Sequence, residues 1–289
     1  MHDFDYLEPE TIDAACAALA AGGEDTRIMA GGTALILALR QRLVMPLRVV
    51  SLSRIAELRG IHQADSGEIS IGACVRHADV AQSPLVAGHY PMLAHLASVL
   101  ANPQVRNQGT LGGNLSYADP STDPPGCLLA IGAQVVLRSV AGERRLSMEE
   151  FLVDYFETAL QPGELLARII LPAPAAGAHG TYARHLRTAA EHRPMANVSI
   201  FSAGSLARPK KVRLVVAAAT PVPVLIEAAR MLEDAMPTCA AIEAVASAAA
   251  MAIEPLSDAR ADGEYRRTVV RVLAARSLAG HFGLPGDAS

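Results

Sequence analysis

The chain has 289 residues, of which 51% are hydrophobic and 19% charged, and its formal net charge is −4. This is enough apolar sequence to bury one large core or two to three small ones, and too much for a disordered chain. The net negative charge disfavours a nucleic-acid-binding role, because it implies no basic face.

The cysteines and the N-terminal segment predict a cytoplasmic protein. Cys16, Cys74, Cys127 and Cys239 lie far apart with no C-x-x-C pair, which disfavours a disulfide framework and a cysteine-ligated metal cluster. We expect buried, reduced thiols instead. The N-terminal residues include acids and no apolar segment of a signal peptide. No uncharged apolar run reaches the length of about 18 residues that a membrane-spanning helix needs.

The first part of the chain predicts a compact β–loop–α–β unit. An alanine-rich helix over residues 10–21 is followed by short strands at 27–29 and 47–52, which flank a helix at about 34–43. The segment Ala30-Gly31-Gly32-Thr33 joins the first strand to the second helix, which is where α/β proteins hold phosphates. It lacks both the GxGxxG and the GK[ST] motif. A plain tight turn explains this short segment equally well.

A second glycine-rich segment covers residues 105–123 and reads VRNQGTLGGNLSYADPSTD. It shows neither strand nor helix periodicity, so we predict a loop. Its glycines allow backbone N–H groups to approach a ligand and point the same way, as phosphate oxygens require. Three glycines exceed what one turn needs, which favours a binding role. Two such segments together suggest a ligand with an extended phosphate part.

Two acids follow these glycines, and each has a structural alternative. Asp119 precedes Pro120, and we expect it to cap a local turn. Asp123 precedes Pro124, which suits a helix N-cap with proline as the first helical residue. The functional alternative is a hydrogen bond from a ribityl or ribose hydroxyl to Asp123. Both interpretations can hold together, because a carboxylate has several acceptor sites.

The residues around this second segment predict short helices and hairpins. A hairpin at 61–63 and 68–71 and helices at 77–82 and 90–100 precede it. A helix from Pro124, a hairpin at 134–139 and 143–146, a helix at 148–155 and a strand at 165–171 follow it.

The last third of the chain predicts a separate α+β unit. Residues 172–180 (PAPAAGAHG) read as a linker, because they are small and contain two prolines and two glycines. Strands are expected at 182–187, 198–205 and 212–219, and helices at about 223–235, 240–252 and 263–280.

The remaining polar residues support neither a metal site nor hydrolase chemistry. The nine histidines form no H-x-H or H-x-x-x-H pattern, and no G-x-S-x-G motif is present. His185 and His192 lie near Arg184 in sequence, either at a functional site or along a solvated sheet edge.

Four motifs, in order along nearly the whole chain, resemble a known family. They are IMAGGTAL, QVRNQGTLGGNLSYADPSTD, GELLARIILP and PLSDARADGEYRRTVVRVLAAR. They resemble the FAD-binding medium subunit of the molybdenum hydroxylases, the family of xanthine dehydrogenase and carbon monoxide dehydrogenase.

The resemblance implies an α+β fold with a PCMH-type FAD-binding domain. Two α/β subdomains, residues 1–57 and 58–175, would hold FAD between them. A C-terminal flavoprotein domain, residues 176–289, would contribute a three-stranded antiparallel sheet and helices.

The resemblance also assigns cofactor-binding residues, but no catalytic residue and no metal ligand. The family's first diphosphate loop falls on Arg27, Ile28, Met29, Ala30, Gly31, Gly32 and Thr33. Its second FAD loop falls on Gly109, Thr110, Gly112, Gly113 and Asn114, and its ribityl-side acid falls on Asp123. Leu100 and Leu166 would pack on the cofactor, with Leu166 beside the isoalloxazine ring, and Arg184 falls where relatives carry a basic residue, often Lys, near the flavin. Ala34 and His192 depart from the polar residue and the flavin-side tyrosine that relatives carry there.

In function, the resemblance implies an electron-transfer subunit of an oxidoreductase. FAD would be the only cofactor on this chain, with molybdopterin on a large partner subunit and 2Fe–2S clusters on a small one. Electrons would pass from the clusters through FAD to an acceptor (NAD, a quinone or oxygen), and the complex would be a dimer of heterotrimers. One alternative is a self-sufficient PCMH-type flavin oxidase. Another is a nucleotide-binding module that has lost its flavin.

Overall fold

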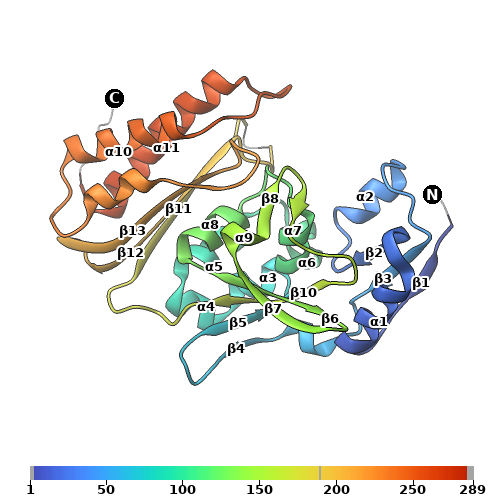
Figure 1. The fold of residues 1–289 in the computed structure, drawn as a ribbon. Helices are drawn as coiled ribbons and strands as arrows, with labels where there is room; N and C mark the ends of the chain where they lie inside the picture. Colours follow the sequence, from blue (N-terminus) through green and yellow to red (C-terminus); the bar gives the residue numbers. More distant parts are fainter. Residues whose placement is uncertain (1–2, 189, 285–289) are drawn as a thin grey trace.

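The computed structural model describes residues 3–188 and 190–284, and it has the predicted α+β class. Three principal sheets follow one another along the chain. In Figure 1 they run from the blue N-terminal part on the right, through the centre, to the orange C-terminal part at the upper left. Among the described residues, no helix is long and apolar enough to cross a membrane.

The first sheet is parallel and has the order β1-β3-β2. Its strands and helices are β1 (Asp5–Leu7), α1 (Ile12–Gly22), the 3₁₀ helix η1 (Gly23–Asp25), β2 (Thr26–Met29), α2 (Leu35–Arg40) and β3 (Arg48–Ser51). Thr11 is the N-cap residue of α1, because its side chain accepts a hydrogen bond from the Ala14 N–H at 3.1 Å. Strand β2 lies at the edge of this sheet, and the chain continues from its end into residues 30–33. The expected β–loop–α–β unit is confirmed, with β1 as an additional strand.

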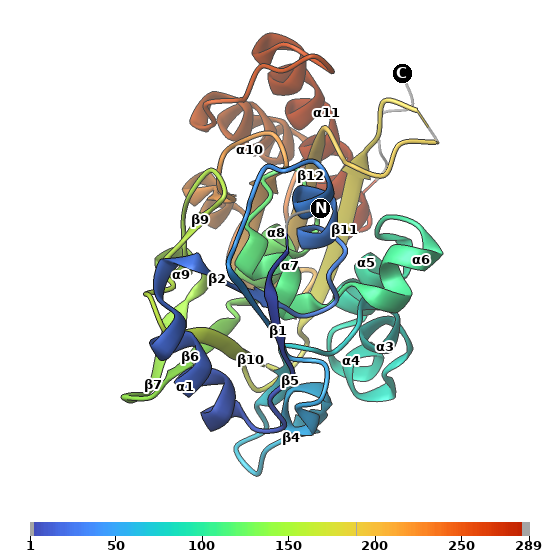
Figure 2. The same cartoon turned by 90° about the vertical axis from the view of Figure 1, so that its right-hand side faces the viewer.

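The second sheet is antiparallel, with the order β4-β5-β10-β6-β7. Its strands are β4 (Ile61–Gln63), β5 (Ile69–Gly72), β6 (Gln134–Ser139), β7 (Gly142–Ser147) and β10 (Leu165–Leu171), and η2 (Ala56–Arg59) precedes β4. The helices are α3 (His77–Gln82), α4 (Pro84–His89), α5 (Pro91–Val99), α6 (Pro103–Gln108), α7 (Leu111–Tyr117), α8 (Pro124–Ile131) and α9 (Met148–Phe151). A small hairpin, β8 (Leu152–Asp154) and β9 (Glu157–Thr158), follows α9. Figure 2 shows α3 to α6 grouped beside the sheet.

The third sheet is antiparallel and lies between two helical layers. It contains β11 (His179–His185), β12 (Ala196–Ser205), β13 (Arg208–Ala217) and β14 (Val224–Leu225), so a two-residue strand extends the expected three. The elements after it are η3 (Glu227–Leu232), α10 (Cys239–Ala252) and α11 (Gly263–His281). Helices α10 and α11 cover one face of this sheet, whereas α8 contacts β12 and β13 on the other. The C-terminal unit therefore packs directly on the helix that follows the second glycine-rich segment.

Several local predictions were wrong. Residues 105–123 are not one loop, because α6 ends at Gln108 and α7 spans Leu111–Tyr117. Asn102 and Thr110 cap these two short helices, and a single helical turn or two is too short to show an amphipathic period. The helix expected at 148–155 ends at Phe151, and that expected at 223–235 is a strand followed by a 3₁₀ helix. The linker at 172–180 is shorter than expected, because β11 begins at His179.

Candidate functional site

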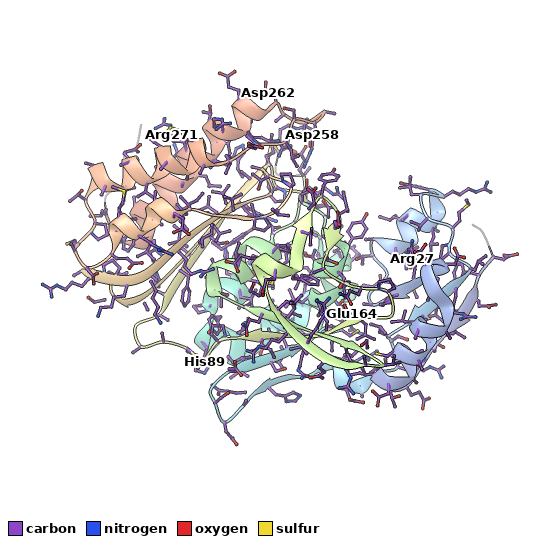
Figure 3. The ribbon with its side chains drawn as sticks, viewed as in Figure 1. Arg27, His89, Glu164, Asp258, Asp262 and Arg271 are labelled. Carbon is purple, nitrogen blue, oxygen red and sulfur yellow. The ribbon has the colours of Figure 1, made fainter. Side chains whose placement is uncertain are left out.

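A large cavity lies between the first sheet and the helices that accompany the second sheet. Its volume is about 1020 Å³, at the upper end of the range for small-molecule sites. Both glycine-rich segments line it, together with residues 160–166 and 192–193. Arg27 and Glu164, which Figure 3 labels, both belong to this lining.

The two glycine-rich segments touch each other at this cavity. A Cβ atom added to Gly31 would lie 2.1 Å from the Gln108 carbonyl oxygen and 2.9 Å from the Gly109 Cα atom. Only a residue without a side chain allows this approach. Gly32 follows with φ +73°, a conformation that favours glycine. The two segments therefore form one continuous wall, although almost 80 residues separate them in sequence.

The first segment presents unused backbone donors. The N–H groups of Gly31, Gly32 and Thr33 have no acceptor among the residues that the structure describes. The carbonyl of Gly32 meanwhile accepts the Ile36 N–H at 3.0 Å and fixes the entry into α2. A run of free N–H groups after a strand and before a helix suits phosphate oxygens.

The second segment differs from the sequence-based expectation. Most of its N–H groups are used inside the protein: that of Leu111 bonds the Val75 carbonyl and that of Gly112 the Ala73 carbonyl, both at 3.0 Å. The Gly113 N–H donates to Thr110 Oγ1 at 3.1 Å. Gly112 is needed for packing, because its Cβ atom would lie 2.5 Å from the Ala73 Cβ atom. This segment thus shapes the cavity wall more than it supplies donors.

Asp123 lies at the centre of a buried polar cluster. Its Oδ1 atom accepts hydrogen bonds from the Tyr182 hydroxyl and from Asn197 Nδ2, and its Oδ2 atom accepts one from Arg184 Nη1 at 3.1 Å. Burial raises the pKa of Asp123, and these donors oppose that rise. The residue occupies the N-cap position of α8 without a capping hydrogen bond, because Pro125 offers no N–H and the carboxylate is bound elsewhere.

The C-terminal unit makes polar contacts with Asp119, Ser121, Thr122 and Asp123 of the cavity wall. Asp119 pairs with Arg193 at 2.9 Å, and the Ser121 hydroxyl accepts a hydrogen bond from Arg260 Nη2 at 2.9 Å. Asn197 Nδ2 reaches the Thr122 carbonyl at 3.2 Å. Asp119 also accepts the N–H of Ser121 at 2.9 Å, which confirms the turn expected there.

The structure brings together all the predicted cofactor residues except Arg184. Arg27 to Thr33, the predicted residues of the 109–114 segment, and Asp123 line the cavity, as do the buried side chains of Leu100 and Leu166. Arg184 does not line it, and its guanidinium group bonds Asp123 and the Val99 carbonyl. Ala34 and His192 do belong to the lining. The contact of each residue with FAD stays a prediction.

Sequence reasoning missed several parts of the lining, among them His77 and the stretch 160–165. His77 is 3% exposed but borders the cavity, and burial lowers its pKa to about 4. A lone histidine has no spacing signal that could have identified it. The stretch 160–165 has no residue pattern that indicates a binding role, and a tertiary ion pair at 2.7 Å joins its Glu164 to Arg144.

Comparisons with known proteins cover nearly the whole chain. Residues 2–174 match the family described as "FAD binding domain in molybdopterin dehydrogenase", and residues 192–280 match the "CO dehydrogenase flavoprotein C-terminal domain". The 6-hydroxypseudooxynicotine dehydrogenase complex subunit alpha of Paenarthrobacter nicotinovorans is 31% identical, over 96% of this chain and 93% of the relative. The carbon monoxide dehydrogenase medium chain of Hydrogenophaga pseudoflava is 31% identical, over 95% of this chain and 96% of the relative.

Two solved structures of this kind have the same fold over nearly the whole chain. Carbon monoxide dehydrogenase from Hydrogenophaga pseudoflava matches with a TM-score of 0.92 and 31% identity, covering 97% of both chains. Quinoline 2-oxidoreductase from Pseudomonas putida 86 matches with a TM-score of 0.91 and 28% identity, again covering 97% of both chains.

Proposed function

The chain belongs to the family of FAD-binding subunits of molybdenum hydroxylases, and from this premise we propose that it passes electrons from a 2Fe–2S partner subunit to an external acceptor. Its relatives are subunits of dehydrogenase complexes, so it is an oxidoreductase subunit. FAD, when bound, supplies the redox chemistry. The protein binds the cofactor, orients it and limits its contact with water.

The observation that carries this proposal is the row of N–H groups at Gly31, Gly32 and Thr33, which have no acceptor among the described residues and belong to the lining of a cavity of about 1020 Å³. A diphosphate needs such donors, and the contact between Gly31 and Gln108 leaves no room for a side chain beside them. Because FAD combines a diphosphate with extended apolar rings, this cavity fits it: donors lie on one wall, and the buried Leu100 and Leu166 lie on others.

We assign roles to the remaining residues on the same basis. Arg27 carries a positive charge beside the first segment and lines the cavity. Asp123 retains acceptor capacity for a ribityl hydroxyl. Arg184 acts through Asp123, which it orients by their ion pair at 3.1 Å. The boundaries at residues 57/58 and 175/176 separate the two FAD-binding subdomains and the C-terminal flavoprotein domain.

The partners follow from family membership. We propose a large subunit with the molybdenum cofactor and a small 2Fe–2S subunit, assembled as a dimer of heterotrimers. NAD, a quinone or oxygen serves as the acceptor class. In the described part of this chain, no group of three or more His, Cys, Asp or Glu residues could hold a metal ion.

The test is the visible absorption spectrum of the co-purified complex and of this chain alone. Flavin bands on this chain, with iron–sulfur absorption only in the complex, support the proposal. Acid precipitation of the holoprotein should release free flavin into the supernatant, whereas a covalently tethered oxidase would keep it in the pellet. Absence of flavin from both samples, or iron–sulfur absorption on this chain alone, would refute the assignment.

A further inference from the structure

His77 lines the proposed cofactor cavity and lies next to the second glycine-rich segment. It is the first residue of α3, and its N–H donates to the Gly109 carbonyl at 3.1 Å. The neighbouring hydrogen bond from the Leu111 N–H to the Val75 carbonyl, at 3.0 Å, fixes the same two stretches of chain against each other. Backbone pairing therefore places the imidazole, which is 3% exposed and lines the cavity.

The buried imidazole of His77 is incompletely satisfied by the protein. Its Nδ1 atom is buried and has no hydrogen-bond partner among the described residues. His281 provides a contrast: it is 1% exposed, but its two ring nitrogens meet Thr181 Oγ1 and Ser202 Oγ, both at 2.9 Å. Buried polar atoms in folded proteins are normally paired. Nδ1 is closed off from the cavity, but the other ring nitrogen, Nε2, also has no hydrogen-bond partner among the described residues and is not fully buried. Because His77 lines the cavity, Nε2 is the ring nitrogen that a group from outside the chain can reach.

The imidazole lies where the two glycine-rich segments converge. A Cβ atom added to Gly109 would be 3.3 Å from His77 Cδ2 and also 3.3 Å from Thr33 Oγ1. The ring and the Thr33 hydroxyl thus lie on the same side of Gly109, beside the free N–H groups of the first segment. Burial lowers the pKa of His77 to about 4, so the ring is neutral near pH 7 and carries one N–H donor and one acceptor.

We propose that His77 is a further cofactor-binding residue, whose Nε2–H group donates a hydrogen bond to the diphosphate part of FAD at the junction of the two glycine-rich segments. This inference rests on the proposed function, which places the diphosphate there. Phosphate oxygens only accept hydrogen bonds, and the neutral ring supplies a donor without the like-charged repulsion or desolvation that a buried cation would add.

The experiment compares His77→Leu and His77→Gln in the full chain, stripped of flavin and titrated with FAD by flavin fluorescence. His77→Leu should bind FAD at least about tenfold more weakly, because a hydrogen bond to a charged group is lost. His77→Gln retains an N–H donor and should recover most of that affinity. The FAD-free His77→Leu protein should unfold at the same or a higher temperature than wild type, because the change removes an unpaired buried polar group.

His281→Leu is the matched control, since it replaces a buried histidine that has protein partners and lies away from the cavity. It should lower the unfolding temperature of the FAD-free protein and leave FAD affinity unchanged. If His77→Leu also destabilises the FAD-free protein and binds FAD as tightly as wild type, His77 is structural and the inference is overturned. Wild-type protein that binds no FAD at all would overturn the proposed function itself.

Discussion

Replacing Gly31 with alanine should force apart the two glycine-rich segments that border the cavity. The added Cβ atom would lie 2.1 Å from the Gln108 carbonyl oxygen and 2.9 Å from the Gly109 Cα atom. Both are backbone atoms, so no side-chain rotation relieves the clash. The change therefore perturbs the relation between the two segments and adds no new polar or charged group.

The structure gives the size of this perturbation. Real Cβ atoms essentially never approach another heavy atom within 3.0 Å, so the oxygen and the new Cβ atom must separate by at least 3.0 − 2.1 = 0.9 Å. Overpacking of this kind costs about 1–3 kcal/mol of stability. A shift of 0.9 Å also exceeds the roughly 0.5 Å window of N–H···O hydrogen-bond distances. We expect FAD affinity to fall at least about tenfold, which corresponds to about 1.4 kcal/mol.

The assay measures FAD binding by flavin fluorescence and unfolding by circular dichroism. Gly88→Ala is the control, because Gly88 lies on the exposed surface of α4 and its Cβ atom would meet nothing within 4 Å. That change should leave FAD affinity unaltered and stabilise the protein by up to about 1 kcal/mol, through helix propensity. Gly31→Ala should instead lower the unfolding midpoint by roughly 2–10 °C.

Equal behaviour of the two alanine variants would refute this reasoning. A Gly31→Ala protein with wild-type FAD affinity and an unchanged unfolding midpoint would mean that the two segments do not meet at Gly31. A loss of stability without a loss of affinity would mean that they meet but do not form the cofactor site.

Three further predictions concern the polar groups of the site and core. Asp123→Asn leaves Arg184 without its charged partner. Because Asp123 is 2% exposed, we expect the free energy of unfolding, measured with denaturant, to fall by about 3–5 kcal/mol. A fall below about 1 kcal/mol would contradict the pairing. Arg260→Ala removes the link to the cavity wall, so stopped-flow measurements should show FAD dissociating several times faster, whereas an unchanged rate would argue against this link. Burial lowers the pKa of His77 to about 4 and that of His281 to about 3, from 6.5; the unfolded chain therefore binds more protons, and stability falls as pH drops below 6.5. For His77 the loss amounts to roughly 3 kcal/mol by pH 4, and His77→Leu should show a shallower decline of the urea midpoint with pH.

The sequence by itself determined the family, the α+β class and most of the elements. The order of the four motifs indicated the family, and the family models that match residues 2–174 and 192–280 confirm this assignment. The strand at 165–171 was predictable because it is a short, nearly continuous apolar run, and the helix at 240–252 because it is a longer, alanine-rich run. Short helices such as α6 and α7 were not, because their caps are local but their stability comes from packing.

The tertiary structure decided how the predicted residues act. The sequence suggested that both glycine-rich segments present N–H groups, but the Ala73 and Val75 carbonyls accept two of those in the second segment. Arg184 does not line the cavity but pairs with Asp123, which does, in a contact between residues 61 positions apart. His77 gave no signal at all, because an unpaired buried nitrogen is a property of its surroundings and not of its sequence. Such features depend on which distant groups meet, and local residue patterns carry no record of that.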